Sequence, residues 1–225
     1  MKGKIIVIDG ADGSGKATQS RLLFQKLKNH RIKTALLNIP VYESFTGKMV
    51  ASYLRNEFGR IDPHLAAMLY AVNRFQQKAK IVNWLKEGRV VILNRYVTAN
   101  QIHQASHYKS TKLRNEFVKW VGDLEYGIFG LPKPDLVLFI NMPVELAYEL
   151  IKLKSPKERK YAAGSKGDIL ESDLEHQKEA LNQAMRLLQK GKVWRQITGA
   201  KGGKLLPKTE ISQLVWEEVK KFLRT

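Results

Sequence analysis

Short apolar runs rich in β-branched residues alternate along the chain with longer segments whose apolar residues recur every three or four positions. The runs predict strands and the longer segments predict helices. The predicted strands are Lys4–Asp9, Lys33–Ile39, Val90–Leu93, Leu136–Ile140 and Trp194–Thr198. The predicted helices are Gln19–Lys28, Pro63–Lys86, Leu113–Phe129, Val144–Leu153, Ser172–Lys190 and Ile211–Leu223. Strands that alternate with helices indicate a parallel sheet with helices on both faces.

The longest predicted helix, Pro63–Lys86, carries two different faces. A polar and aromatic face has the spacing i, i+3, i+4, i+7 and consists of Tyr70, Asn73, Arg74 and Gln77. An apolar face consists of Leu65, Leu69, Val72 and Phe75. The apolar face can point toward the core, whereas a polar face of this kind is more often a solvated or packing feature than a binding surface.

Length and composition fit one folded domain that spans residues 1–225. Hydrophobic residues make up 44% and charged residues 27%, which excludes a disordered chain and a collagen-like one. No apolar run approaches the roughly 20 residues of a membrane span, and the N-terminal apolar stretch lacks a small-residue cleavage site. Without cysteine, disulfides and cysteine-based metal sites are excluded. We therefore expect a cytoplasmic protein with no membrane partner.

The formal net charge of +18 is concentrated in three basic segments, at 13–42, 152–166 and 190–208. Such charge serves to bind nucleic acid, to attract a small anionic ligand, or only to form a solvated lysine-rich surface. Basic stripes alone are weak evidence for nucleic acid, so we do not expect a nucleic-acid partner. Residues 155–167 show no clear periodicity and predict a loop or a flap.

A glycine-rich stretch follows the first predicted strand and leads into the first helix. It has the form Gly10-x-x-x-x-Gly15-Lys16, and Gly13 lies within it. Glycines let a phosphate approach consecutive backbone N–H groups at the positive end of the following helix, and Lys16 adds a cation. The alternative is a glycine-rich turn with an exposed lysine. The strand–loop–helix context favours phosphate binding.

The residue after the loop lysine departs from the usual pattern. Ala17 stands where a Ser or Thr hydroxyl usually holds magnesium, and Thr18 comes one position late. Asp9, the last residue of the first strand, offers a carboxylate that suits Mg²⁺ and could offset the missing hydroxyl. The alternative role for Asp9 is to pair with a nearby cation.

Arg95 follows a buried strand directly, although arginine is rarely buried without a partner. In an open parallel sheet, ligands bind beyond the carboxyl ends of the strands, where both Asp9 and Arg95 fall. A guanidinium can bind a phosphate through two parallel hydrogen bonds. We therefore expect a second anion site beside the first; an ion pair between Arg95 and Asp9 alone is the alternative.

Five stretches together resemble the thymidylate kinase family, over nearly the whole chain and in the family's order and spacing. They are IDGADGSGKATQ at 8–19, IPVY at 39–42, LYAVNRF at 69–75, NRYVTANQIHQ at 94–104 and GLPKPDLVLFINMP at 130–143. The segment GDILESD at 167–173 looks like the acidic stretch that closes the family's lid.

The resemblance implies an α/β fold, the three-layer P-loop kinase fold with a five-stranded parallel sheet, helices on both faces and a basic lid at about residues 154–168. It also implies Mg²⁺-dependent transfer of a phosphoryl group from ATP to dTMP, giving dTDP and ADP for dTTP synthesis, and a homodimer. The residues that would bind ATP are Gly10, Ala11, Asp12, Gly13, Ser14, Gly15, Lys16, Ala17 and Thr18.

The resemblance also implies an acceptor site. Arg95 would hold the phosphate of dTMP with help from Tyr42. Tyr70, at a position where phenylalanine is usual, would stack on thymine. Arg74 and Asn100 would hydrogen-bond the polar edge of the base.

Further roles follow from the same resemblance. His103 would lie near the 3′ side of the sugar, where it could help to reject ribonucleotides, and Gln104 is a neighbouring pocket residue. Some members carry a catalytic arginine where this chain has Gly13, and the others use basic lid residues. Of the lid candidates Lys154, Lys157, Arg159 and Lys160, Arg159 is preferred because its planar fork suits a transferring phosphoryl group. The expected catalytic residues are Lys16, Arg95, Asp9 and Arg159.

Three positions depart from the family pattern. Asn94 stands where the family usually has aspartate, Asn73 where it often has aspartate, and Val41 where a basic residue is frequent. Two carboxylates expected near bound phosphates are thereby lost. Two alternatives stay open: a kinase of another pyrimidine monophosphate such as dUMP, and a non-catalytic P-loop protein that binds nucleic acid through its basic patches.

Overall fold

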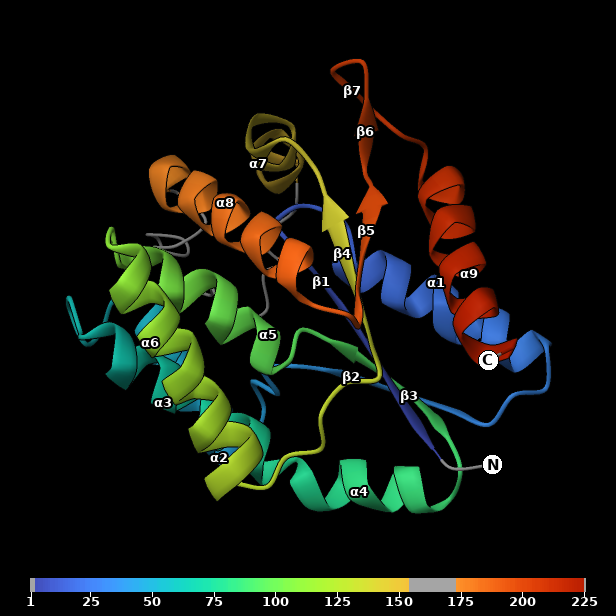
Figure 1. Cartoon of the computed structure of the whole chain (residues 1–225), viewed down its shortest axis with the longest axis horizontal. Helices are drawn as coiled ribbons and strands as arrows, with labels where there is room; N and C mark the ends of the chain where they lie inside the picture. The colour runs from blue at the N-terminus through green and yellow to red at the C-terminus, as the bar shows by residue number, and fades with distance from the viewer. Residues whose placement is uncertain (1–2, 154–172, 225) are drawn as a thin grey trace.

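The computed structural model describes residues 3–153 and 173–224, and it places a five-stranded parallel sheet at the centre of the chain (Figure 1). The strands are β1 (Lys4–Gly10), β2 (Thr34–Asn38), β3 (Val90–Asn94), β4 (Leu136–Asn141) and β5 (Trp194–Thr198). Their spatial order is β2-β3-β1-β4-β5. All five strands predicted from the sequence are therefore present, and the predicted fold class is confirmed.

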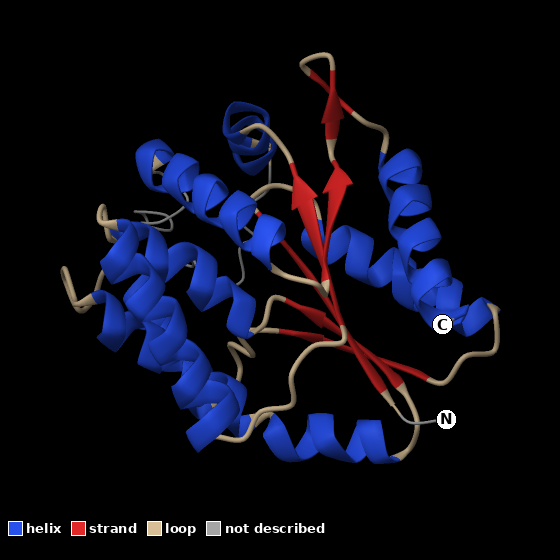
Figure 2. Cartoon of the chain, in the orientation of Figure 1, coloured by secondary structure: helices blue, strands red, loops and turns tan. Residues whose placement is uncertain are grey.

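Helices cover both faces of this sheet (Figure 2). The α-helices are α1 (Lys16–Asn29), α2 (Phe45–Leu54), α3 (Pro63–Gln76), α4 (Lys78–Lys86), α5 (Val97–Ala99), α6 (Thr111–Gly122), α7 (Val144–Lys152), α8 (Leu174–Lys190) and α9 (Lys208–Arg224). The remaining elements are the π-helical segments η1 (Asn100–Gln104) and η3 (Asp123–Ile128), the 3₁₀ turn η2 (Ala105–His107), and a hairpin of β6 (Ala200–Lys201) and β7 (Lys204–Leu205). No described helix is both long enough and apolar enough to cross a bilayer.

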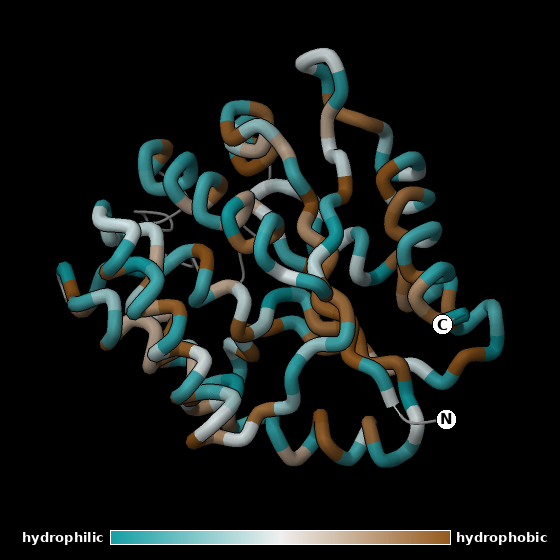
Figure 3. Tube along the Cα trace, viewed as in Figure 1, coloured by the Kyte–Doolittle hydropathy of each residue, from teal (hydrophilic) through white to brown (hydrophobic). Residues whose placement is uncertain are grey.

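The alternation of side chains along β1 explains the two faces. Ile5 and Val7 pack with residues of α4 and α6, whereas Ile6 and Ile8 pack with residues of α1 and α9. Successive strand residues point to opposite faces, so a strand covered on both sides is apolar throughout. Figure 3 shows this as a hydrophobic centre along the strands.

The carboxyl ends of β1 and β3 lie side by side. Ile8 is paired with Asn94 in the ladder, and the backbone N–H of Arg95 donates to the carbonyl of Ile8 at 3.0 Å. Asp9 and Arg95 therefore lie at the same edge of the sheet, as the sequence predicted.

Several elements differ from the sequence prediction. The predicted helix Pro63–Lys86 is interrupted at Gln77, whose N–H bonds the carbonyls of Arg74 and Phe75, and α4 starts in a new direction (Figure 1). Helix α2 and the hairpin β6–β7 were not predicted. In α2, Ser44 caps the first turn by accepting from the N–H of Gly47, a start signal that the sequence analysis overlooked.

The prediction for the apolar face of α3 was wrong for three of its four residues. Leu65, Val72 and Phe75 are 46%, 41% and 46% exposed, whereas Asn73 and Arg74 are 0% and 1% exposed. Leu69 alone of the four packs against a buried cluster. Asn73 and Arg74 are buried because their side chains find hydrogen-bond partners inside the molecule.

Candidate functional site

The glycine loop joins β1 to α1 and is closely packed. Gly15 precedes the helix with a φ of 85°, a left-handed conformation that glycine adopts without strain. Gly13 leaves no room for a side chain, because a Cβ built there would lie 2.0 Å from the carbonyl oxygen of Ala147 in α7. The missing side chain at position 13 is therefore a packing requirement of this chain.

Lys16 lies over this loop and is almost fully buried. Its Nζ donates to the carbonyls of Gly10 at 2.9 Å and Ala11 at 2.7 Å, and it lies 3.5 Å from Oδ1 of Asp12. The ammonium group is thus held at the start of α1, where the helix end is also positive. The loop concentrates positive potential in the place where a phosphate chain would bind.

Asp9 is fully buried at the end of β1. Its Oδ1 accepts from the N–H of Gly10 at 2.9 Å, and its Oδ2 accepts from the hydroxyl of Thr98 at 2.8 Å. Nη1 of Arg95 lies 4.0 Å away. The carboxylate is therefore fixed between the glycine loop and the helix that follows β3.

Arg95 makes its closest ion pair with Asp12 rather than with Asp9. Its backbone is left-handed, with a φ of 64°, a strained conformation that is typical of functional sites. Burial alone would lower the pKa of Arg95, but the charges of Asp12 and Asp9 outweigh it and raise the pKa. The expected alternative, a pair with Asp9 alone, is not what the structure shows.

Asp12 connects the two basic groups of the site. Its carboxylate contacts the guanidinium of Arg95 and lies 3.5 Å from the ammonium of Lys16. Burial would raise the pKa of Asp12, yet Arg95 and Lys16 outweigh it and hold the pKa far below its ordinary value. One carboxylate therefore lies between a cation of the glycine loop and a cation at the end of β3.

His103 lies on the other side of Arg95. Burial, followed by the charge of Arg95, lowers the pKa of His103 well below its ordinary value. Its ring is therefore neutral near pH 7, and Nε2 accepts from Nη1 of Arg95 at 2.8 Å. The phenols of Tyr42 and Tyr70 are also near enough to Arg95 to influence its pKa. Four residues predicted for the acceptor side or the loop, Asp12, Tyr42, Tyr70 and His103, thus surround one guanidinium together with Asp9.

The predicted base-binding residues are held by a residue that the sequence analysis missed. Glu125, from η3, accepts from Nε and Nη2 of Arg74 at 2.5 and 2.7 Å, and from Nδ2 of Asn100 at 3.1 Å. Arg74 and Glu125 lie far apart in the sequence, on different helical elements. No short sequence motif predicts this ion pair.

What we call the base-binding wall consists of Tyr70 and Arg74 of α3, Asn100 and Gln104 of η1, and Glu125 of η3. The ring of Tyr70 meets that of Tyr53 edge-on, with centroids 6.2 Å apart. Gln104 is buried in η1, and its Oε1 has no hydrogen-bond partner among the described residues. Asn100, His103 and Gln104 all come from this single π-helical segment, a geometry that is frequent at functional sites.

The two asparagines that depart from the family pattern have different surroundings. Nδ2 of Asn94 donates to Asn38 at the ends of β3 and β2. Asn73 binds the backbone N–H of Val41 and the hydroxyls of Ser44 and Thr46. Asn73 therefore holds the segment that carries Tyr42.

The lid candidates Lys154, Lys157, Arg159 and Lys160 lie outside the described residues. Within residues 3–153 and 173–224, no group of three His, Cys, Asp or Glu side chains is arranged to hold a metal ion.

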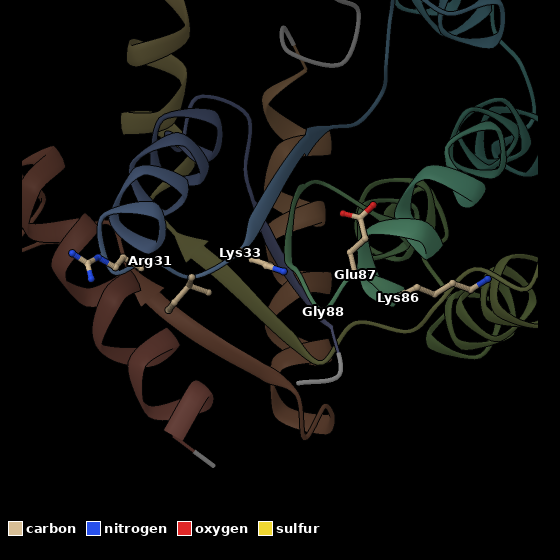
Figure 4. A pocket seen from close by; sticks show the side chains of 6 residues that line it. Arg31, Lys33, Lys86, Glu87 and Gly88 are labelled. Atoms are coloured by element: carbon tan, nitrogen blue, oxygen red, sulfur yellow. The ribbon is translucent and has the colours of Figure 1, made fainter.

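Two further hollows are lined by residues other than Arg95. One, of about 540 Å³, is lined by Arg31, Lys33, Lys86 and Glu87 at the amino ends of β2 and β3, the opposite edge of the sheet. Figure 4 shows Arg31 and Lys86 pointing in opposite directions, so its cations do not converge. The other, of about 1060 Å³, shares Gln104 with the candidate site and extends along α8.

Comparisons with known proteins point to one family. The family model described as thymidylate kinase matches residues 8–193. A thymidylate kinase of Plasmodium falciparum is 30% identical over 146 residues, 65% of this chain and 65% of its own length. The human thymidylate kinase is 30% identical over 141 residues, 63% of this chain and 62% of its own. The match thus spans less than two thirds of each relative.

A solved structure gives the same fold. Thymidylate kinase from Candida albicans superposes with a TM-score of 0.73 at 24% identity, covering 98% of this chain and 92% of that one. At this identity the likeness concerns the fold alone.

Proposed function

Since the chain belongs to the thymidylate kinase family, we propose that it transfers the terminal phosphoryl group of ATP to dTMP, giving dTDP and ADP. The observation that carries the proposal is Asp12, whose carboxylate bridges Lys16 and Arg95. A cation for the donor phosphates and a cation for the acceptor phosphate therefore lie on either side of one group. Transfer between two phosphates requires such proximity more than it requires covalent chemistry.

On the donor side, the amides of residues 10–18 and the ammonium of Lys16 bind the phosphates of ATP. On the acceptor side, Arg95 orients the phosphate of dTMP, assisted by Tyr42. No general base is needed, because a phosphate monoester is already largely ionised near pH 7. Arg159, outside the described residues, is proposed to stabilise the transferring group.

The base and sugar of dTMP bind against the wall formed by α3 and η1. Tyr70 stacks on the ring of thymine, and Arg74 and Asn100 bind its polar edge. His103, which is neutral and bonded to Arg95, lies beside the sugar together with Gln104.

Magnesium fits the residues present. Mg²⁺ at nucleotide sites is held by one or two carboxylates together with phosphate oxygens and water, and Asp9 is a buried carboxylate fixed at the start of the loop. Each oxygen of Asp9 already accepts one hydrogen bond but keeps a second lone pair. We therefore propose that Asp9 would hold the ion either directly or through water. An ion held there would neutralise charge on the donor phosphates.

We also propose that the protein is a homodimer. Leu65, Met68, Val72 and Phe75 are exposed by 40% or more and follow one stripe of α3. A contiguous exposed apolar stripe of this kind marks an interaction surface. Sedimentation should give twice the chain mass for the wild type and one chain mass for Val72→Lys; a monomeric wild type would refute the dimer.

The decisive experiment measures ADP release from ATP and Mg²⁺ with a panel of nucleoside monophosphates. dTMP should give the highest kcat/KM. A preference for another pyrimidine monophosphate would identify that substrate instead. No ADP with any acceptor, together with salt-sensitive binding of oligonucleotides, would favour the non-catalytic alternative.

A further inference from the structure

Glu125 is a fully buried carboxylate that the reaction itself does not use. It lies in η3, and its two oxygens accept from two nitrogens of Arg74 and from the amide nitrogen of Asn100. The oxygens of a carboxylate that is paired with a guanidinium can only accept hydrogen bonds. It therefore dictates which atoms of its two neighbours are used inside the protein and which remain for a ligand.

The amide of Asn100 is held in one orientation. Its Nδ2 donates to the carbonyl of Ala67 at 2.9 Å and to Oε1 of Glu125 at 3.1 Å. Both partners are acceptors, so the opposite orientation would place Oδ1 against two other acceptors. An amide nitrogen has two hydrogens, and both are used here. Asn100 can therefore offer a ligand only its carbonyl oxygen, an acceptor.

Arg74 is constrained in the complementary sense. Nε and Nη2 are bound by Glu125 at 2.5 and 2.7 Å, which leaves Nη1 as the nitrogen without a bond to this carboxylate. A guanidinium has no acceptor. Arg74 and Asn100 therefore form a fixed pair, one donor and one acceptor.

We propose that Glu125 is the positioning residue that fixes this donor–acceptor pair and thereby makes the site select 4-keto pyrimidines against 4-amino pyrimidines. Thymine and uracil present an O4 acceptor and an N3–H donor, which complement Arg74 and Asn100. Cytosine presents an N4 amino donor and an N3 acceptor, so both of its groups oppose the pair. The proposal rests on the proposed acceptor site and adds the residue that sets its selectivity.

Glu125→Gln tests this with nearly the same shape. A glutamine has one oxygen and one NH₂, so its NH₂ must replace either Oε1 or Oε2. If the NH₂ replaces Oε1, it faces both Arg74 and Asn100, and only the carbonyl of Ala67 still orients the amide of Asn100. If it replaces Oε2, Arg74 loses the acceptor of its Nε, so in either case the donor–acceptor pair is no longer fixed on both sides. Glu125→Asp changes the shape but keeps two acceptor oxygens.

The experiment is calorimetric binding of dUMP and dCMP to the full chain without ATP, since these two nucleotides differ only in the base groups at issue. Wild type should bind dUMP at least about 100-fold more tightly than dCMP, because a mismatch leaves buried polar groups unpaired. Glu125→Gln should narrow that ratio at least about tenfold. Glu125→Asp should lower the affinity for both nucleotides yet still bind dUMP more tightly than dCMP.

Glu179→Gln is the matched control. Glu179 pairs with the buried Arg114 at 3.1 Å rather than with Arg74 or Asn100, and its loss should leave the ratio unchanged. A merely structural role for Glu125 predicts the opposite order, with the shape-changing Asp more harmful to selectivity than Gln.

Three outcomes would overturn the proposal: equal binding of dUMP and dCMP by wild type, an unchanged ratio in Glu125→Gln, or a Glu125→Asp variant that has lost the preference. If Glu125→Gln does not fold, as judged by its melting curve, wild type and Glu125→Asp still decide. Selective binding without ADP release would refute the proposed activity and leave this inference standing. ADP release from dTMP without selective binding would do the reverse.

Discussion

The glycine loop and the base-binding wall are built in contrasting ways. The loop is one contiguous stretch, and backbone conformation and Lys16 suffice to define it. The wall is assembled from α3, η1 and η3, and it depends on a buried ion pair between Arg74 and Glu125. An anion site can thus be encoded locally, whereas a site that reads the edge of a base needs side chains fixed by distant partners.

The largest effect on activity is expected from removing the two cations at the centre of the site, Lys16 of the loop and Arg95 at the end of β3. Lys16→Ala and Arg95→Ala should each lower kcat/KM at least about 100-fold, on the order of 2.7 kcal/mol. Steady-state assays with each substrate varied in turn should show that Arg95→Ala raises the KM for dTMP more than the KM for ATP. Near-normal turnover in Arg95→Ala would remove the basis for assigning this side to the acceptor.

Gly13→Ala should break the loop through its packing. The new Cβ would meet the carbonyl of Ala147 at 2.0 Å and sit at a φ of 81°, so we expect a loss of about 2 kcal/mol in the free energy of unfolding. Denaturant titration measures this loss. Gly59→Ala is the control, because Gly59 has a φ of 64° but nothing within 4 Å, and it should cost about 1 kcal/mol. Equal losses in the two variants would show that the contact with α7 is unimportant.

Acid should destabilise the side of the molecule that contains His103 and His176. Burial, with His107 as the next cause, lowers the pKa of His176 to about 4, so the unfolded chain takes up its proton first as the pH falls. Stability should therefore decrease as the pH falls from about 6.5 toward 4, by about 1–2 kcal/mol at pH 5 from His176 alone. Urea titrations of wild type and His176→Gln at pH 7 and pH 5 measure this, and the same pH dependence in both would contradict it.

Asn94→Asp should have the smallest effect. Asn94 donates to the exposed Asn38, whose amide can turn and donate to an aspartate instead. We expect turnover to change less than about threefold, below roughly 0.7 kcal/mol. A large rise in kcat would instead mark the natural site as impaired by the missing carboxylate.

The sequence predicted what depends on contiguous residues. The five strands, the glycine loop and the placement of Asp9 and Arg95 at one edge follow from local pattern and the geometry of parallel sheets. It failed where a polar residue is satisfied by a distant partner. The burial of Arg74 depends on Glu125, and that of Asn73 on the segment around Val41, so these two polar residues of α3 lie inside while Leu65, Val72 and Phe75 lie outside.

The contact between Gly13 and α7 also limits how this chain can diverge. An arginine at position 13 would require the backbone of α7 to move away from Ala147, so a single substitution cannot introduce it. A loop arginine and a displaced α7 must arise together, in two segments far apart in the sequence. Engineers who wish to move positive charge into this loop should redesign α7 first.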